Sequence, residues 1–129
     1  MKVLALDYGS ARTGVAVSDP SGALARPLTT IERIGTPAGL ARLIAIVGEE
    51  QPELLLVGLP VREDGTRGEQ ANATLAFVGR LKPNCAVPIE LEDERFTSRI
   101  AELKGGGSGL DDRAAAVLLQ GWLDRHAGA

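Results

Sequence analysis

The sequence contains little cysteine, histidine or aromatic side chain, and each shortage excludes a class of site. Among its 129 residues there is one cysteine and one histidine, which excludes an internal disulfide and a zinc site of the usual cysteine and histidine spacing. A Ser/His/Asp catalytic set is equally implausible with a lone His126 near the C-terminus. Because a single thiol, Cys85, suits a reducing compartment, we expect a cytoplasmic location.

Long apolar runs are also missing. The longest, Leu54–Leu59 and Ala114–Leu119, are far shorter than the about 20 residues of a membrane-spanning helix. The start of the chain, from Met1 to Asp7, has one basic residue and no small-residue cleavage site behind it, so we expect no signal peptide and no membrane partner. With 44% hydrophobic and 24% charged residues, we expect one globular domain that covers residues 1–129.

Positive charge is scarce overall. The net charge is −3 and the isoelectric point is near 5.2, which excludes a surface that holds nucleic acid by charge alone. Only Lys2, Lys82 and Lys104 are lysines, however, and the other basic residues are arginines. Guanidinium groups match phosphate geometry bidentately, so local phosphate contacts remain compatible with this composition. Genome composition is the alternative explanation for most of the arginines.

Hydrophobic periodicity and turn signals predict the order of the elements. The predicted strands cover residues 2–7, 14–18, about 24–31, 54–59 and 87–92, and the predicted helices cover residues 37–50, about 67–82, a segment from near Thr97, and about 111–126. Thr36 is placed to cap the helix that begins at Pro37. Pro27 predicts that its strand lies at a sheet edge.

This order predicts an α/β fold. The first three strands form antiparallel hairpins, and the later strand-helix-strand units require right-handed crossovers that place parallel strands beside the first strand. The expected result is a mixed five-stranded sheet with helices on both faces. The uninterrupted aliphatic run at residues 54–59 is typical of a central strand that is buried on both faces.

Carboxylates stand at the ends of three predicted elements. Asp7 ends the first strand, where burial would be costly unless the group is paired or binds a metal. Asp93 and Glu94 end the strand at 87–92, and the alternation of Ile89, Leu91 and Asp93 favours Asp93 as the inward group. Helix capping is the alternative role for either acid.

The last helix begins with a third candidate acid. Its predicted buried stripe consists of Ala115, Leu118, Leu119 and Trp122. Asp111 lies one turn before this stripe, whereas Asp112 lies further round the helix. Asp111 is therefore either an N-terminal cap or a ligand that points into a cleft.

These three positions are expected to converge. Parallel neighbouring strands end at the same sheet edge, and the glycine-rich loop at 105–109 allows the last helix to reach that edge. A cluster of carboxylates binds hard divalent ions, so Mg²⁺ or Mn²⁺ is favoured over zinc. In the turn after Asp7, Gly9 and Ser10 can bring backbone N–H groups to a phosphate that Arg12 neutralises, although an ordinary hairpin turn explains the same residues.

Four ordered motifs resemble the YqgF family, also called RuvX. They are Leu4–Ala16 with its Asp-Tyr-Gly-Ser turn, Val57–Pro60 followed by Asp64-Gly65-Thr66, the Asp93–Ser98 segment, and Asp111 followed by Ala114–Gln120. Together they span nearly the whole chain. The unusually glycine-rich loop before Asp111 and the Asp111-Asp112 doublet depart from the family pattern.

The resemblance implies an RNase H-like fold and a nuclease that matures 16S ribosomal RNA ends or resolves Holliday junctions. It implies that Asp7, either Asp93 or Glu94, and Asp111 are the catalytic and metal-binding acids. Two Mg²⁺ or Mn²⁺ ions about 3.5–4 Å apart would supply the activated water and the charge stabilisation. The arginines expected to hold the nucleic-acid backbone are Arg12, Arg62, Arg67, Arg95 and Arg99.

Two other functions stay open at this stage. The Asp-Tyr-Gly-Ser hairpin also resembles the phosphate loop of actin-like ATPases and sugar kinases, but those enzymes close two such domains over ATP. A nucleic-acid-binding module without turnover is the other alternative. The expected partner is precursor rRNA or branched DNA, and a homodimer suits paired cuts in a junction but is not needed for RNA trimming.

Overall fold

The computed structural model describes residues 1–60, 64, 68–94 and 111–126. Its elements are β1 (Val3–Asp7), β2 (Arg12–Ser18), β3 (Ala25–Glu32), α1 (Pro37–Glu50), β4 (Leu54–Leu59), α2 (Glu69–Leu81), the short 3-10 helix η1 (Lys82–Asn84), β5 (Ile89–Asp93) and α4 (Asp111–His126). The helix expected from near Thr97 lies outside the described residues. No helix in the described part is long and apolar enough to span a membrane.

The strands form one mixed sheet in the order β3-β2-β1-β4-β5. β1 and β2 are antiparallel, as are β2 and β3, whereas β4 lies parallel to β1 and β5 lies parallel to β4. The predicted five-stranded α/β architecture is therefore confirmed. β3, which contains Pro27, is an edge strand as expected, because proline cannot donate a ladder hydrogen bond.

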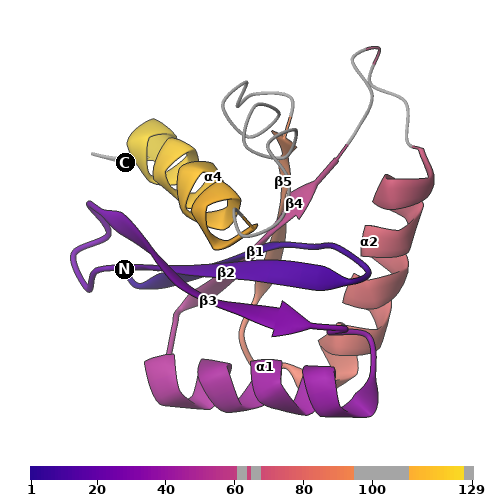
Figure 1. Cartoon of the computed structure of the whole chain (residues 1–129). Coiled ribbons are helices and arrows are strands. Elements are labelled where there is room, and N and C mark those ends of the chain that lie inside the picture. The colour runs from indigo at the N-terminus through magenta and orange to yellow at the C-terminus, as the bar shows by residue number, and fades with distance from the viewer. Residues whose placement is uncertain (61–63, 65–67, 95–110, 127–129) are drawn as a thin grey trace.

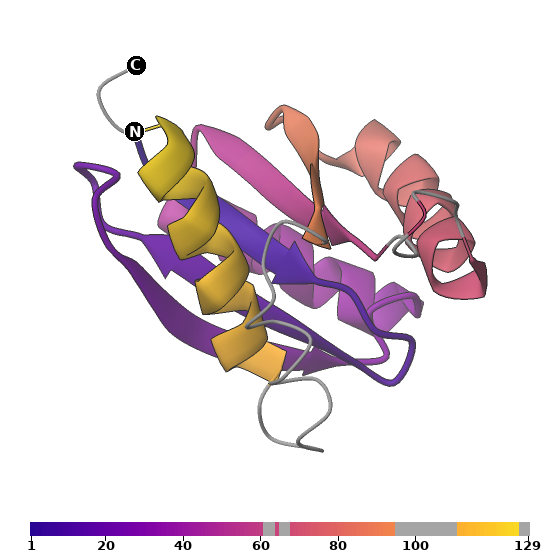
Figure 2. The same cartoon turned by 90° about the horizontal axis from the view of Figure 1, so that it is seen from above.

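Helices cover both faces of the sheet (Figure 1). α1 and α2 pack on one face against Leu and Val side chains of the strands, in a core that also contains Leu43, Phe77 and Leu81. α4 packs on the other face, against Val3, Ala5, Ala16 and Leu56. Figure 2 shows α4 lying over β1, β2 and β3, with β4 and β5 to one side of it. The two faces are called the α1/α2 face and the α4 face below.

Local chemistry explains where the helices begin and end. The Thr36 hydroxyl accepts a hydrogen bond from the Gly39 amide at 3.1 Å, so the predicted cap of α1 is confirmed. The chain of α2 continues into η1 instead of a longer α-helix, because Pro83 has no N–H to donate. β5 begins at Ile89, two residues later than expected, directly after Pro88.

The direction of α4 follows from contacts at two points along it. The Gln120 side chain accepts from the Ala25 amide at 2.9 Å and donates to the Ala23 carbonyl at 3.0 Å, beside the turn that joins β2 to β3. Leu118 lies against Gly58, near the carboxyl end of β4. α4 therefore runs antiparallel to β1, and its first residues lie toward the edge of the sheet where β1, β4 and β5 end.

Candidate active site

Asp7 is a buried acid at the carboxyl end of β1. Its side chain is only 4% exposed, and it occupies the last position of the strand, opposite Gly14 of β2. Val3 and Ala5 belong to the core under α4, so alternation along the strand places Asp7 on the α4 face. A carboxylate at such a place must be stabilised by a partner or a cation.

Three glutamates of the β5 segment also lie on the α4 face. The Trp122 indole donates to Glu90 at 2.5 Å, and Arg125 forms an ion pair with Glu92, so these two acids fasten α4 to β5. Glu94, the third, follows the end of the strand. It is the glutamate of this row that lies at the carboxyl edge of the sheet.

The Glu94 carboxylate reaches across the sheet to β4. A Cβ atom built on Gly58 would lie 2.7 Å from Glu94 Oε1 and 2.9 Å from Leu118 Cδ2. Leu6 pairs with Val57 in the parallel register of β1 and β4, so Gly58 and Asp7 occupy the next positions of adjacent strands. Glu94 and Asp7 therefore lie on the same face at the same edge, and the missing side chain of Gly58 gives Glu94 its place.

The Asp93 position lies on the α1/α2 face, opposite to the α4 face that holds Asp7. This differs from the expectation, based on alternation along the strand, that Asp93 is the inward acid. Its register partner is Leu59, and the Ile89 and Leu91 positions before it pair with Leu55 and Val57 of the α1/α2 core. Asp93 does alternate with the apolar residues of β5, as expected. The sheet is apolar on both faces, however, and Asp7 lies on the opposite one, so parity with apolar neighbours does not identify the acid beside Asp7.

The backbone of Asp111 begins α4, as the sequence predicts. The predicted stripe of Ala115, Leu118, Leu119 and Trp122 is buried against the sheet. Leu118 packs at Gly58, and Asp111 precedes it by seven residues, or about 10 Å of helix. The start of α4 therefore lies toward the sheet edge that holds Asp7, while the Asp111 side chain lies outside the described part.

The turn between β1 and β2 is tightly closed. The Thr13 hydroxyl donates to the Gly9 carbonyl at 3.1 Å and accepts from the Gly9 amide at 3.3 Å. A Cβ on Gly9 would lie 2.3 Å from the Arg12 carbonyl oxygen, so only glycine fits. Ser10 and Arg12 are exposed on this turn, at the same edge as Asp7. The other predicted phosphate-binding arginines, Arg62, Arg67, Arg95 and Arg99, lie outside the described residues.

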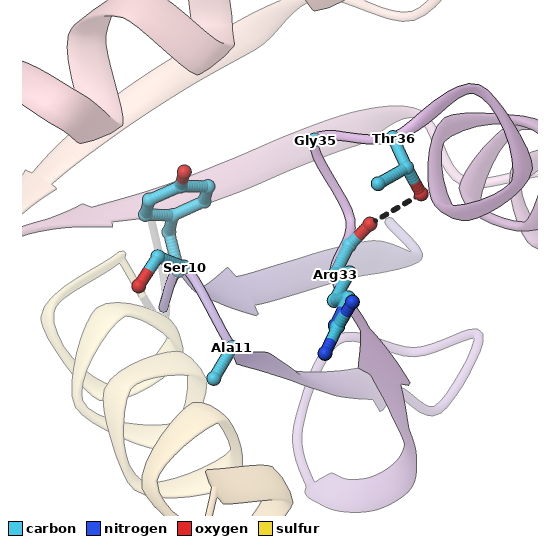
Figure 3. Close-up of a pocket in the computed structure, with 6 residues that line it drawn as sticks. Ser10, Ala11, Arg33, Gly35 and Thr36 are labelled. Carbon is cyan, nitrogen blue, oxygen red and sulfur yellow. Dashed lines mark hydrogen bonds between the residues drawn. The ribbon is translucent and has the colours of Figure 1, made fainter.

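Sequence reasoning missed Arg33, which lines a cavity beside this turn (Figure 3). Its backbone has a φ of 47°, in the left-handed region, and its amide donates to the Ala11 carbonyl at 2.9 Å. The sequence signal that could have identified Arg33 is its position directly after a strand and three residues before a helix cap. Turn residues at such a position project from the end of a sheet.

The donor set at this edge suits a hard divalent cation. Asp7 and Glu94 offer oxygen ligands only, and no sulfur or imidazole ligand accompanies them in the described part. Among the side chains that the structure describes, no three acids or histidines lie close enough to form a complete metal site. Asp111, the third acid that the sequence analysis expects here, begins α4, and its side chain lies outside the described part.

Comparisons with known proteins identify the family of the chain. A family model described as RuvX, Holliday junction resolvase, matches residues 1–125. A protein of Anaeromyxobacter dehalogenans strain 2CP-C, named as a candidate pre-16S rRNA nuclease, is 39% identical over 98% of this chain and 99% of its own length. A protein of Crocosphaera subtropica with the same name is 44% identical over 98% of this chain and 94% of its own length.

Solved structures share the fold at low sequence identity. Thermus thermophilus RuvC in complex with a Holliday junction has a TM-score of 0.63 at 18% identity, covering 98% of this chain and 96% of that one. The fowlpox virus resolvase with its junction DNA has a TM-score of 0.57 at 10% identity, covering 98% and 99%. These likenesses support the RNase H-like architecture. The chain belongs to the RuvX family, the family that its sequence motifs resemble.

Proposed function

We propose that this chain is a nuclease that hydrolyses phosphodiester bonds in structured nucleic acid. The observation that carries the proposal is that Asp7 and Glu94 lie on the same α4 face at the carboxyl ends of β1 and β5, in a member of the RuvX family. The kinase-like alternative is not favoured, since the family and its relatives are described as resolvases and nucleases.

We assign the catalytic site to Asp7, Glu94 and Asp111. When bound, a pair of Mg²⁺ or Mn²⁺ ions would supply an activated water and neutralise the charge that develops on the phosphate. Asp7 provides a carboxylate fixed by burial, and Glu94 provides one that bridges toward it over Gly58. Asp93 faces the α1/α2 side and stays outside this set.

Precursor 16S rRNA is the substrate we favour. The relatives that bear this name align with nearly the whole chain at about 40% identity, whereas the junction-bound structures are below 20% identity. Branched DNA is the second candidate because the family model carries the resolvase description. We expect a homodimer only if branched DNA is the substrate, since one active site suffices to trim RNA. A cytoplasmic location and one domain over residues 1–129 stay predictions.

Cleavage of two labelled substrates tests the proposal. The purified protein is incubated with a precursor rRNA fragment and with a four-way DNA junction, each with Mg²⁺, with Mn²⁺, and with a chelator. We expect metal-dependent cuts in the rRNA fragment and weaker or no cutting of the junction. If neither substrate is cut with either ion, the nuclease assignment fails.

The Asp111-Asp112 doublet provides a matched pair within this assay. Asp111→Asn should lower turnover by orders of magnitude if Asp111 completes the site. Asp112→Asn should cost no more than the about 1 kcal/mol of a weakened helix start and leave cleavage nearly intact. Selective loss in Asp112→Asn would instead give the ligand role to Asp112.

A further inference from the structure

A shallow, open cavity lies at the same edge of the sheet as Asp7. Its volume is about 330 Å³, and it is lined by Tyr8, Ser10, Ala11, Arg33, Gly35 and Thr36. One wall is the turn between β1 and β2, and the other is the turn between β3 and α1 (Figure 3). Because Tyr8 directly follows Asp7 in the chain, the cavity begins one residue away from the buried acid.

Backbone hydrogen bonds hold the two walls together. The Arg33 amide donates to the Ala11 carbonyl at 2.9 Å. The Arg33 carbonyl accepts from the Thr36 amide at 3.0 Å and from the Thr36 hydroxyl at 2.7 Å. The position of the Arg33 Cα relative to the β1–β2 turn is therefore fixed without any ligand.

The floor of the cavity is equally well supported. The Tyr8 ring stacks on Phe77 of the α1/α2 core, with 5.0 Å between ring centroids. The Gly9 turn behind it is closed by both hydrogen bonds of Thr13, whose side chain is fully buried. A cavity with such walls is preformed, so little conformational freedom is lost when a ligand enters.

The charge of the cavity is positive. No acidic residue is among its lining residues, and in the described part of the chain the Arg33 guanidinium forms no ion pair. A second guanidinium, that of Arg80, donates to the Gly35 carbonyl at 3.4 Å. In a protein with a net charge of −3, two arginines at one small cavity select an anionic ligand.

The start of α1 does not provide the anion contact. Thr36 already caps it by accepting the Gly39 amide, and Pro37 has no N–H to offer. The side-chain donors that remain among the lining residues are the Arg33 guanidinium and the hydroxyls of Tyr8 and Ser10. A guanidinium is suited to a phosphodiester, because it can donate hydrogen bonds to two of its oxygens.

We propose that this cavity binds a phosphodiester of the substrate strand next to the one that is cut, with Arg33 as its cation. The inference rests on the proposed nuclease function and adds a subsite to it. Arg33 does not contact the scissile bond, so it is a positioning residue that sets which phosphate reaches Asp7. Its effect belongs to substrate binding and not to the chemical step.

A variant that binds nucleic acid without cutting it isolates the contribution of Arg33 to substrate binding. In an Asp7→Asn background, affinity for the labelled rRNA fragment and for the four-way junction is measured by fluorescence anisotropy between 50 and 300 mM salt. Arg33→Ala should weaken binding of both about tenfold. It should also reduce the slope of log affinity against log salt by about 0.7–0.9, the value for one lost phosphate contact. With Asp7 intact, KM should rise while kcat stays unchanged.

Three variants control for the fold and for charge. Arg33→Gly removes the same guanidinium at a position with positive φ, where glycine is unstrained, and should match Arg33→Ala. Arg33→Lys should restore the salt slope but not the full affinity, because an ammonium cannot bind bidentately. Arg26→Ala removes an exposed arginine at the opposite end of β3 and should change neither quantity.

Each outcome supports or overturns the inference. If the wild type cuts nucleic acid but Arg33→Ala and Arg33→Gly behave like Arg26→Ala, the subsite is refuted while the nuclease function stands. A loss confined to one of the two substrates refutes recognition of the phosphate backbone. A drop in kcat with unchanged KM refutes the positioning role. Failure of the wild type to cut either substrate refutes the proposed function itself.

Discussion

The two faces of the sheet are built from side chains of different size. Toward α1 and α2 the buried apolar side chains of the strands are Leu, Ile and Val, from Leu4 and Leu6 to Leu55 and Val57. Toward α4 the neighbouring strand positions include Ala5, Ala16 and Gly58. Small residues permit close approach of a helix, and at Gly58 they permit approach of a carboxylate as well.

This difference separates stability from chemistry. Large aliphatic side chains on the α1/α2 face fill a closed core, and within the described residues no buried acid lies at its edge. The α4 face combines a thinner apolar layer with Asp7, a charged group whose burial is costly. Apolar packing on one face can hold the sheet in place while the other face keeps an acidic site at its edge.

The sharpest contrast is between two neighbours in β1. Leu6→Ala should destabilise the fold by about 3 kcal/mol, because Leu6 is fully buried on the α1/α2 face. Asp7→Asn should lower cleavage by orders of magnitude and leave stability unchanged or higher, since it removes a buried charge. Thermal midpoints and cleavage rates of both variants measure these two effects. A marked loss of stability in Asp7→Asn would contradict the separation of stability and chemistry between the two faces.

The next contrast is between two neighbours at the end of β5. Glu94→Gln should reduce cleavage by at least a hundredfold, whereas Asp93→Asn should change it by only a few-fold. The reason is that Glu94 extends over Gly58 toward Asp7, while Asp93 faces the α1/α2 side. Single-turnover rates at saturating Mn²⁺ measure this, and the reverse order would place Asp93 in the site.

Gly58→Ala tests the close approach itself. The new methyl group would lie 2.7 Å from the Glu94 carboxylate and 2.9 Å from Leu118, so we expect a loss of about 1–3 kcal/mol in stability and at least a tenfold loss in cleavage. Gly79→Ala is the control: nothing lies within 4 Å of its added Cβ in α2, and it should stabilise by up to about 1 kcal/mol.

A double variant distinguishes crowding from general damage. Glu94→Asp shortens the carboxylate by one methylene, so combining it with Gly58→Ala should restore part of the activity lost in Gly58→Ala alone. No recovery, with stability still reduced, would attribute the effect of Gly58→Ala to Leu118 and not to Glu94.

The smallest effect concerns an acid at the opposite edge of the sheet. Asp19 accepts from the Leu24 and Ala23 amides at 2.8 Å, and its pKa is lowered from 3.8 to about 2, chiefly by the Leu24 amide and then by the Ser21 hydroxyl. Because the folded pKa is depressed, its contribution to stability is present above about pH 4 and is lost as the pH falls toward 2. Thermal midpoints of wild type and Asp19→Asn should converge over that range, with cleavage at neutral pH unchanged.

Much of the architecture could be predicted because each signal is local. Thr36 and Pro37 define the start of α1, Pro27 identifies an edge strand, and the aliphatic run of β4 requires two covered faces. The stripe of α4 could be read from its 3.6-residue period. These features depend on a few consecutive residues, and the structure has them where the sequence placed them.

The choice between Asp93 and Glu94 could not be made in this way. Alternation along β5 gave the correct face for Asp93, but whether that face holds Asp7 depends on the register of β1, β4 and β5 together. The position of Arg33 beside the β1–β2 turn could not be predicted either, because it depends on a contact between residues far apart in the sequence. Its amide bonds to Ala11, which lies 22 positions earlier in the chain.

The sequence by itself determined the order of the elements, the antiparallel-then-parallel sheet, and the placing of acids at the ends of β1, β5 and α4. Tertiary structure alone decided which of these acids share a face, because β1 and β4 have two apolar faces and periodicity cannot rank them. It also decided that Gly58 makes room for Glu94, and that the turn carrying Arg33 closes against the turn after Asp7. Those contacts join residues far apart in the chain, so they exist only once the strands are in register.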